Sequence, residues 1–255
     1  MNSVIQRITD ALRTLSPSEN WRYFTSAILL AAGSGDRFGQ VMGRKQFCPV
    51  CGVPALVHTL RAFETSSYIN EIIIVTRDSE IPRCREYADM YGMRKVTKII
   101  AGGNDRQASA KLGFDAISDK SKYVAIHDGA RCLITTDIID NTIRSAHEHG
   151  AAIAAERSRD TVKIATDTGF AKDSPDRNTV WLAKTPQVFL ADMYRAAVYT
   201  AEKDGVRATD DSMLVERLGF KVKMVECGNE NIKLTTPNDL ILAEAIMRSR
   251  QEESQ

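Results

Sequence analysis

Short, mostly apolar runs alternate with segments of helical spacing through the first half of the chain. The runs occupy residues 27–30, 72–75, 96–100 and 123–126. Each run is too short for a helix and has the apolar character of a strand buried on both faces of a parallel sheet. Helix-like stretches separate them, as at 55–64 and 109–117. This alternation indicates βαβ units and therefore an α/β fold with a mostly parallel, twisted sheet.

The beginning of the chain follows a different pattern. Residues 2–15 have apolar positions at helical spacing, and a proline soon after them ends the pattern. We therefore expect residues 1–24 to form a helical extension outside one catalytic domain that spans 25–250. Its role cannot be assigned from the sequence.

The second half of the domain predicts an arm and a closing strand and helix. Residues 151–178 become polar and contain Pro175, which favours strands that leave the sheet as an arm. A last strand is expected at 221–225, and Pro237 is placed to begin the final helix.

Composition excludes several classes of protein. The 43% hydrophobic and 26% charged residues are typical of a globular enzyme. The 34 Lys and Arg against 33 Asp and Glu give a net charge of +1, so we expect no nucleic-acid partner. No apolar run approaches the ~20 residues that a membrane helix needs, and the chain starts without a secretory pattern. We expect a cytoplasmic protein with no membrane partner.

The five cysteines are an odd number spread through the chain, so reduced thiols are the simpler expectation. Cys48 and Cys51 have the spacing of half a zinc or redox site, but no second pair or histidine cluster completes it. The alternative is that they are small apolar residues flanking a turn at Gly52.

Polar segments follow three of the predicted strands, at residues 33–45, 102–106 and 127–131. Ligands of open parallel sheets bind beyond the carboxyl ends of the strands, so these three segments are expected to converge on one crevice.

The first of these segments is rich in glycine and carries two cations. Gly33, Gly35 and Arg37 supply exposed backbone N–H groups and a positive charge, which suit the phosphates of a nucleotide. The glycine spacing fits neither the dinucleotide fingerprint nor a P-loop, which argues against a dehydrogenase. Lys45 adds a second cation, and the pair can neutralise a triphosphate during its cleavage, although two solvated surface charges would produce the same pattern.

The third segment has an acid at the end of a buried strand. Asp128 can hold Mg²⁺ directly or through water, because this cation prefers oxygen ligands. The alternative is a structural pair between Asp128 and Arg131. His127 is expected to pack or cap the strand rather than to act as a base, because the phosphate of a second substrate is already ionised.

Taken in order, several short motifs resemble the 2-C-methyl-D-erythritol 4-phosphate cytidylyltransferase family. They lie at 30–39, 45–47, 102–106, 127–131, 159–163, 184–187, 208–211 and 231–237. Each motif is weak by itself, whereas their order is specific. The resemblance extends from residue 27 to about residue 247.

The resemblance implies a Rossmann-like nucleotidyltransferase fold with a protruding β-arm for dimerisation. It implies transfer of CMP from CTP to 2-C-methyl-D-erythritol 4-phosphate, which gives 4-(cytidine 5'-diphospho)-2-C-methyl-D-erythritol and pyrophosphate. Magnesium, or another divalent cation, is the implied cofactor, and CTP, a small polyol phosphate and a second copy of the chain are the implied partners.

The same resemblance assigns roles to individual positions. The catalytic positions are Arg37, Lys45, Asp128, which also holds the metal, and Lys233. The substrate-binding positions are Ala31, Ala32, Gly33 and Gly35 around the nucleotide, Gly103, Asn104, Arg106 and Ser109 near the cytosine and ribose, Gly129, Arg131 and Thr235 in the later motifs, and Arg159 with Thr209 at the sugar phosphate. Arg159 lies on the arm and would reach the site of the neighbouring subunit.

Departures from the family pattern bear on loop rigidity and affinity rather than on reacting groups. Arg44 and Cys132 replace usual prolines, Lys184 replaces a common glutamine, and Asn104 replaces a common acid or other polar residue.

Two alternatives remain at this point. A sister enzyme that uses a pentitol phosphate, such as ribitol 5-phosphate, would share the CTP half of the site, but its arm tends to lack the arginine matched by Arg159. A catalytically inactive nucleotide-binding module is the second alternative, and the joint presence of Arg37, Lys45 and Asp128 argues against it.

Overall fold

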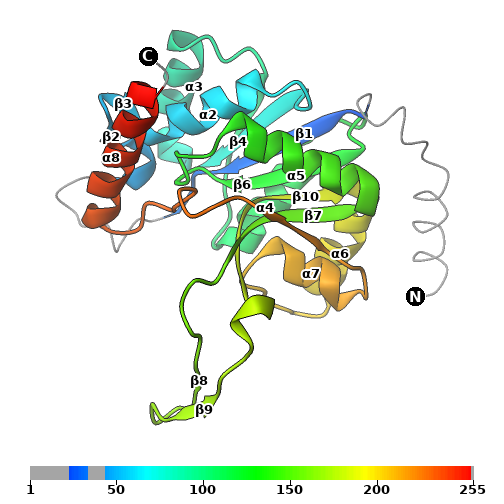
Figure 1. Cartoon of the computed structure of the whole chain (residues 1–255). Helices are drawn as coiled ribbons and strands as arrows, with labels where there is room; N and C mark the ends of the chain where they lie inside the picture. The colour runs from blue at the N-terminus through cyan, green and yellow to red at the C-terminus, as the bar shows by residue number, and fades with distance from the viewer. Residues whose placement is uncertain (1–22, 34–43, 254–255) are drawn as a thin grey trace.

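A seven-stranded sheet forms the centre of the computed structural model, which describes residues 23–33 and 44–253 (Figure 1). In spatial order the strands are β5 (Val96–Ala101), β4 (Glu71–Thr76), β1 (Thr25–Leu30), β6 (Tyr123–Asp128), β10 (Trp181–Leu190), β7 (Ala151–Arg157) and β11 (Lys223–Glu226). Within this sheet β10 is antiparallel to both of its neighbours, and the other pairs are parallel. The prediction of a mostly parallel α/β sheet is confirmed.

Helices cover both faces of this sheet. They are α2 (Ala55–Thr65), α3 (Ile81–Met90), α4 (Arg106–Asp115), α5 (Thr136–His149), α6 (Ala191–Lys203), α7 (Asp211–Arg217) and α8 (Pro237–Glu253). On one face, Phe63 of α2 lies 5.1 Å from the His127 ring of β6, measured between ring centroids. On the other face, α4 packs so closely that a Cβ on Gly113 would lie 2.4 Å from Ile28 of β1. Alternating side chains of each strand therefore face different helices.

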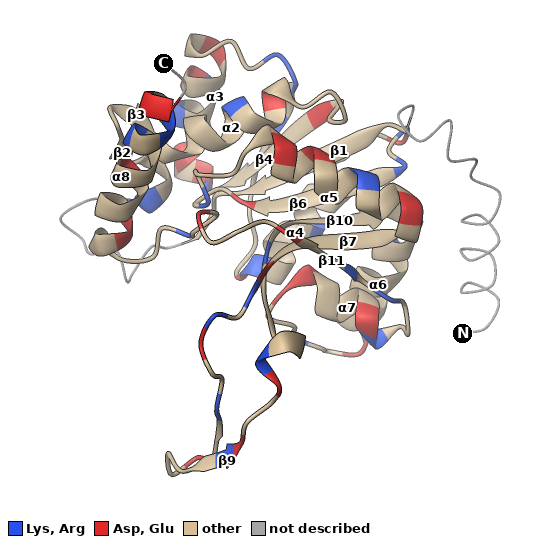
Figure 2. Cartoon of the chain, viewed as in Figure 1, with Lys and Arg blue, Asp and Glu red and all other residues tan. Residues whose placement is uncertain are grey.

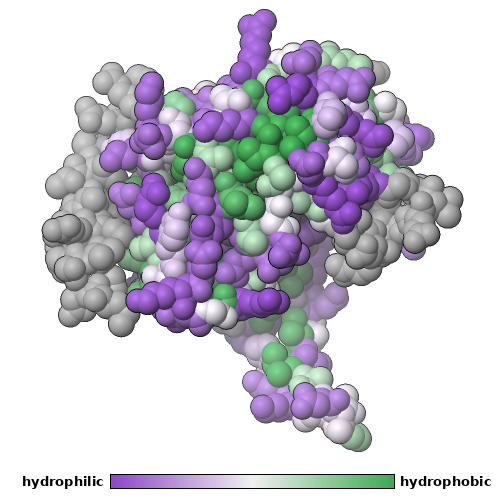
Figure 3. Space-filling model, turned by 180° about the vertical axis from the view of Figure 1, so that it is seen from behind, coloured by the Kyte–Doolittle hydropathy of each residue, from purple (hydrophilic) through white to green (hydrophobic). Residues whose placement is uncertain are grey.

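The arm leaves the body as a long loop that carries two short strands, β8 (Ile164–Ala165) and β9 (Ala171–Asp173) (Figure 1). It begins after Arg157, later than the sequence indicated, because Ala151–Arg157 forms β7 inside the main sheet. β7 lies between β10 and β11, and its alanines are buried, so that their small side chains allow α5 to pack close to the sheet. Seen from behind, the arm projects below the body and exposes hydrophobic as well as hydrophilic side chains (Figure 3).

Smaller elements complete the described chain. A hairpin of β2 (Pro49–Val50) and β3 (Val53–Pro54) contacts α8, and three 3-10 turns occur at η4 (Lys45–Phe47), η5 (Asp78–Glu80) and η6 (Arg177–Thr179). The expected last strand at 221–225 is present as β11, which begins two residues later and ends one residue later. The expected N-terminal helix lies outside the described residues.

Charge is mixed over the surface rather than segregated. In Figure 2, α5 and the arm each carry both acidic and basic residues. Across residues 23–33 and 44–253, no helix has the length and apolar composition required to cross a bilayer.

Candidate active site

A cavity of about 490 Å³ opens at the carboxyl ends of β1, β4, β5 and β6. Its lining residues are Leu30, Ala32, Gly33, Lys45, Arg77, Gly102, Gly103, Asn104, Asp105, Arg106, Ser109, Asp128, Ala130 and Lys233. The three polar segments that were expected to converge on one crevice all contribute to this lining.

Backbone hydrogen bonds hold the first loop beside its neighbours. The N–H of Ala31 donates to the Val75 carbonyl at 2.7 Å, and the N–H of Gly129 donates to the Leu30 carbonyl at 2.9 Å. Gly102 packs against this loop so tightly that a Cβ there would lie 2.6 Å from the Ala32 Cβ. Glycine at this position therefore allows the β1 and β5 loops to share one wall of the cavity.

The N-terminus of α4 forms another wall. The Asp105 carboxylate caps the helix by accepting a 2.7 Å hydrogen bond from the Ala108 N–H. The Ser109 hydroxyl accepts a bond from the Gly103 N–H at 3.1 Å and donates to the Asp105 carbonyl at 2.8 Å. These bonds fix the turn that places Gly103 and Asn104 at the cavity, next to the positive end of the helix dipole.

Asp128, at the end of β6, is the electrostatic centre of the cavity. Its Oδ1 accepts a hydrogen bond from Arg106 Nε at 3.1 Å, and its Oδ2 accepts one from Lys233 Nζ at 2.7 Å. Arg131 Nε lies 3.8 Å from the same Oδ2. Burial raises the pKa of the carboxyl, but these three cations outweigh burial and hold the pKa well below its usual range. Asp128 is therefore ionised at neutral pH, and its oxygens are of the type that ligate a metal ion.

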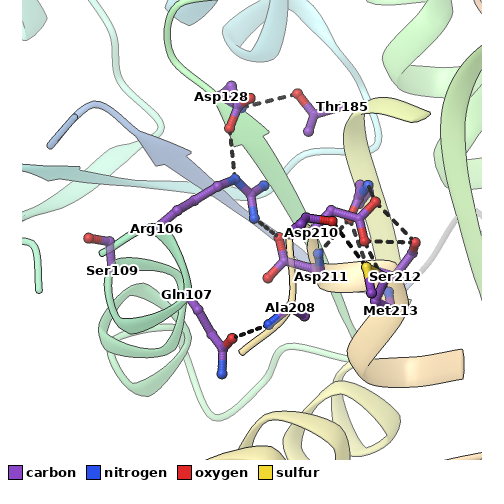
Figure 4. Close-up of polar contacts among 12 residues, drawn as sticks. Arg106, Gln107, Ser109, Asp128, Thr185, Ala208, Asp210, Asp211, Ser212 and Met213 are labelled. Carbon is purple, nitrogen blue, oxygen red and sulfur yellow. Dashed lines mark hydrogen bonds and ion pairs between the residues drawn. The ribbon is translucent and has the colours of Figure 1, made fainter. Parts of the chain in front are cut away.

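Arg106 carries a second ion pair on its other side. Its Nη1 lies 2.7 Å from Asp211 Oδ2, so the guanidinium connects the end of β6 to the start of α7 (Figure 4). Burial lowers the pKa of Arg106, whereas the two carboxylates raise it, and the net direction is upward. Arg106 is therefore a permanent cation in the cavity wall.

His127 faces the opposite side of the sheet and is fully buried. Its Nδ1 is hydrogen-bonded to the Thr185 hydroxyl at 3.0 Å, and burial lowers its pKa to about 3. The imidazole is thus neutral at physiological pH and points away from the cavity, in agreement with the expectation that His127 packs rather than acts as a base.

The segment before α8 positions Lys233. The Leu234 N–H donates to the Ala130 carbonyl at 2.9 Å, and the backbone N–H groups of Thr235 and Thr236 both donate to Asp239 Oδ2 at 2.7 Å. Thr235 therefore shapes the turn after Lys233 instead of lining the cavity.

The predicted site residues fall into three groups. Those that line the cavity are Ala32, Gly33, Lys45, Gly103, Asn104, Arg106, Ser109, Asp128 and Lys233. Those that lie next to the lining without belonging to it are Ala31, Gly129, Arg131 and Thr235. Arg159, exposed on the arm, and Thr209, exposed before α7, do not line this cavity within one chain. Gly35 and Arg37 lie outside the described residues.

Sequence reasoning gave no role to several residues that shape the site, among them Arg77, Asp211 and Tyr194. Arg77 lines the cavity, and its Nε donates to the Ala32 carbonyl at 3.2 Å. It directly follows β4, so the strand-end rule that singled out Asp128 could have found it. Asp211 belongs to the motif at 208–211, but the sequence assigned it no role. Tyr194, which contacts Asp211, had no signal, because its position depends on how α6 packs.

A metal held by Asp128 would depend on the substrate for other oxygens, because the carboxylate of Asp105, which also lines the cavity, caps α4. Among residues 23–33 and 44–253, no three His, Cys, Asp or Glu side chains are grouped as a metal site. Mg²⁺ is often held by one or two carboxylates together with substrate phosphates, and Asp128 fits that arrangement.

Known proteins resemble the chain over almost all of its described length. Residues 25–249 match the model of the family described as 2-C-methyl-D-erythritol 4-phosphate cytidylyltransferase. A protein with this name from Caldanaerobacter subterraneus is 40% identical over 224 residues, which cover 88% of this chain and 98% of the relative.

Solved structures agree with this match. The 4-diphosphocytidyl-2C-methyl-D-erythritol synthase of Anaerococcus prevotii is 32% identical and superposes with a TM-score of 0.80, over 88% of this chain and 96% of that one. The 2-C-methyl-D-erythritol 4-phosphate cytidylyltransferase of Thermus thermophilus is 29% identical, with a TM-score of 0.72 over 88% and 99% of the two chains.

Proposed function

The chain belongs to the 2-C-methyl-D-erythritol 4-phosphate cytidylyltransferase family, and we propose that it works as a magnesium-dependent homodimer whose active site is the cavity around Asp128. It is a nucleotidyltransferase that moves CMP from CTP onto 2-C-methyl-D-erythritol 4-phosphate. The main support for the site is that Arg106 and Lys233 contact one buried carboxylate at the carboxyl end of the sheet, in a cavity that Lys45 also lines. We propose that the reaction takes place in the cytoplasm.

In the proposed reaction, a phosphate oxygen of the sugar phosphate attacks the α-phosphorus of CTP. The new P–O bond forms as the bond to the β-phosphate breaks, and pyrophosphate leaves with the electron pair. The attacking phosphate is largely ionised at neutral pH, so no general base is required. The chain must therefore orient two polyanions and stabilise the negative charge that builds up between them.

Lys45 and Lys233 are placed for this electrostatic task. Both line the cavity, and Lys233 also contacts Asp128 at 2.7 Å. We assign Lys45 to the phosphates of CTP and to the leaving pyrophosphate. Lys233 can contact a phosphate while it remains beside Asp128, because an ammonium group has three donors. Arg37, outside the described residues, is assigned to the same task as Lys45.

Asp128 is the residue we assign to Mg²⁺. When bound, Mg²⁺ would neutralise charge on the phosphate oxygens. Each carboxylate oxygen has two lone pairs, so the bonds to Arg106 and Lys233 leave acceptor capacity on both oxygens.

The arm supports the proposal of a homodimer. Near the tip of the arm, Phe170 is 74% exposed and Ile164 is 46% exposed. Apolar side chains gathered on a projecting segment favour burial against another protein surface. A second copy is the partner we propose, with Arg159 of each arm serving the sugar-phosphate end of the other subunit's cavity together with Thr209.

Pyrophosphate release tests this function. The purified protein is incubated with CTP and Mg²⁺ and with either 2-C-methyl-D-erythritol 4-phosphate or ribitol 5-phosphate. We expect turnover with the first acceptor and little with the second, and a preference for ribitol 5-phosphate would contradict the substrate assignment.

A variant comparison tests the site. Asp128→Asn should lower turnover by roughly 10²–10³, the usual effect of removing one transition-state electrostatic group. Asp192→Asn, on the exposed surface of α6, is the control and should remain fully active. Equal activity of the two variants would exclude Asp128 from the reaction.

A further inference from the structure

The Arg106 guanidinium forms ion pairs with two carboxylates from different elements, Asp128 of β6 and Asp211 of α7. Its Nε donates to Asp128 Oδ1 at 3.1 Å, and its Nη1 donates to Asp211 Oδ2 at 2.7 Å (Figure 4). The guanidinium is planar and rigid, so it cannot rotate without breaking one of these bonds. Arginine otherwise prefers to present two parallel N–H groups to one carboxylate. Asp211 therefore anchors Nη1 and fixes the guanidinium in the orientation in which Nε bonds to Asp128 while Nη2 has no hydrogen-bond partner among the described residues.

The oxygen that Arg106 does not take is the one used by Lys233. Lys233 Nζ lies 2.7 Å from Asp128 Oδ2, on the carboxylate whose other oxygen holds Arg106. If Asp211 were neutral, this anchor would weaken, and Arg106 could turn so that Nε and Nη2 face both oxygens of Asp128 and compete with Lys233. Which oxygen of Asp128 bonds to Arg106 and which to Lys233 thus depends on Asp211, a residue that does not line the cavity.

Asp211 is in turn held by groups that do not line the cavity. Its side chain is 1% exposed, and its Oδ1 accepts a 2.7 Å hydrogen bond from the Tyr194 hydroxyl. Its backbone N–H donates to Gln187 Oε1 at 3.0 Å. Both carboxylate oxygens therefore have a donor, one from Arg106 and one from Tyr194, as a buried carboxylate requires.

Tyr194 is locked in place by aromatic packing. It is fully buried, with its ring 5.1 Å from that of Phe114 in α4 and 5.5 Å from that of Phe189 in β10. Burial, followed by the neighbouring Asp211, raises the pKa of Tyr194 well above its usual value. The hydroxyl thus remains a proton donor throughout the physiological pH range.

We propose that Asp211, oriented by Tyr194, is a positioning residue for cytidylyl transfer: it holds Arg106 so that Asp128 Oδ2 stays available to Lys233 and to the cavity. This inference rests on the proposed role of Asp128. It extends the site by two residues that act through Arg106 and touch no substrate.

Tyr194→Phe is the primary test, because it removes one hydroxyl and preserves the ring. We expect kcat to fall roughly tenfold, the effect of losing a hydrogen bond to a charged group, while KM for CTP changes less than threefold. Asp211→Asn should lower kcat by about 10²-fold, and Asp211→Glu should recover part of that loss because it restores the negative charge.

Tyr199→Phe is a matched control. Tyr199 lies on the same helix, and its hydroxyl donates a bond of equal length, 2.7 Å, to Asp115 on α4, outside the cavity. Thermal unfolding of each variant is followed in parallel, with kcat measured well below the melting temperature. A purely structural role of Tyr194 would lower the melting temperature and leave kcat and both KM values at those of the control.

A double variant supplies a second test, because the effects of Arg106→Gln and Tyr194→Phe on kcat should not add. In an Arg106→Gln background, adding Tyr194→Phe should change kcat less than twofold, because the group through which it acts is gone. A full tenfold loss in that background would overturn the inference. If Asp128→Asn is inactive while Tyr194→Phe matches the control, the positioning role fails and the proposed function stands. If Asp128→Asn is fully active, the proposed function itself fails.

Discussion

The side-chain amide of Gln46 donates a 2.6 Å hydrogen bond to the backbone carbonyl of Ala31. Ala31 begins the glycine-rich loop after β1, and Gln46 directly follows Lys45, so this bond ties the two described ends of the loop together. Gln46 is 2% exposed, and the bond is therefore shielded from water. Its position explains how Lys45 is brought to the cavity wall beside β1.

Gln46→Leu should consequently weaken both the loop and the reaction. The Ala31 carbonyl would lose its side-chain donor in a buried setting, which costs about 1–3 kcal/mol. We expect a lower melting temperature and a roughly tenfold lower kcat, measured by calorimetry and pyrophosphate release. Gln251→Leu, exposed on α8, is the control. A variant as active as this control would show that the bond does not position Lys45.

Removal of Lys45 tests transition-state stabilisation directly. Lys45→Ala should lower turnover by roughly 10²–10³ while CTP still binds, as measured by titration calorimetry. Lys98→Ala, on the exposed edge strand β5, should keep its activity. An unchanged rate in Lys45→Ala would remove this lysine from the mechanism.

Burial of His127 should lower the free energy of unfolding in mild acid. Its pKa is lowered from 6.5 to about 3 by burial, so below pH 6.5 the unfolded chain binds a proton that the folded chain does not. Stability should therefore fall as the pH drops from 6.5 towards 3, with a contribution of about 2 kcal/mol lost by pH 5.

Urea unfolding at pH 7 and pH 5 measures this effect. His127→Gln should show a smaller difference between the two pH values than the unmodified protein, whatever its absolute stability. His149→Gln, exposed at the end of α5, should retain the full difference. The same pH dependence in His127→Gln would contradict the assignment.

Lys184 and Glu156 form an ion pair that is largely removed from water. Lys184 Nζ lies 2.6 Å from Glu156 Oε2, and the lysine side chain is 9% exposed. Removing one partner leaves a charge without its counterion, so Lys184→Met should cost up to about 3 kcal/mol. The double variant Lys184→Met, Glu156→Leu should lose less stability than the single one. Urea unfolding that shows additive losses would contradict this coupling.

The exposed arm provides a test of the proposed homodimer. Phe170 is 74% exposed in one chain, so Phe170→Asp should leave the melting temperature of a monomer unchanged while it weakens a dimer that buries the ring. Sedimentation equilibrium should detect a dimer for the unmodified protein and more monomer for the variant. Lys172→Ala, also exposed on the arm, is the control. A monomeric unmodified protein at high concentration would contradict the proposed homodimer.

Local patterns in the sequence were sufficient to predict four strands of the central sheet and the edge of the sheet at which the cavity lies. The apolar runs correspond to β1, β4, β5 and β6. Continuous burial on both faces makes β1, β4 and β6 visible within a few residues, whereas β5 is a partly exposed edge strand that keeps only some of its apolar positions. Asp128 could be singled out since the carboxyl ends of parallel strands share one edge. β10 was not recognised, because this strand is exposed at its start and buried at its end, so it has neither a continuous apolar run nor regular alternation.

Partnerships between distant residues were decided by the tertiary structure. Arg106 meets Asp211 105 residues later, and Lys233 lies 105 residues from the Asp128 that it contacts. No local spacing specifies such pairs, since they depend on how α4, α7 and the segment before α8 pack against the sheet. The sequence by itself determined which residue types stand at the ends of the strands. Packing determined which of those charges form ion pairs, because ion-pair geometry is set by side chains that the fold brings within 3 Å of each other.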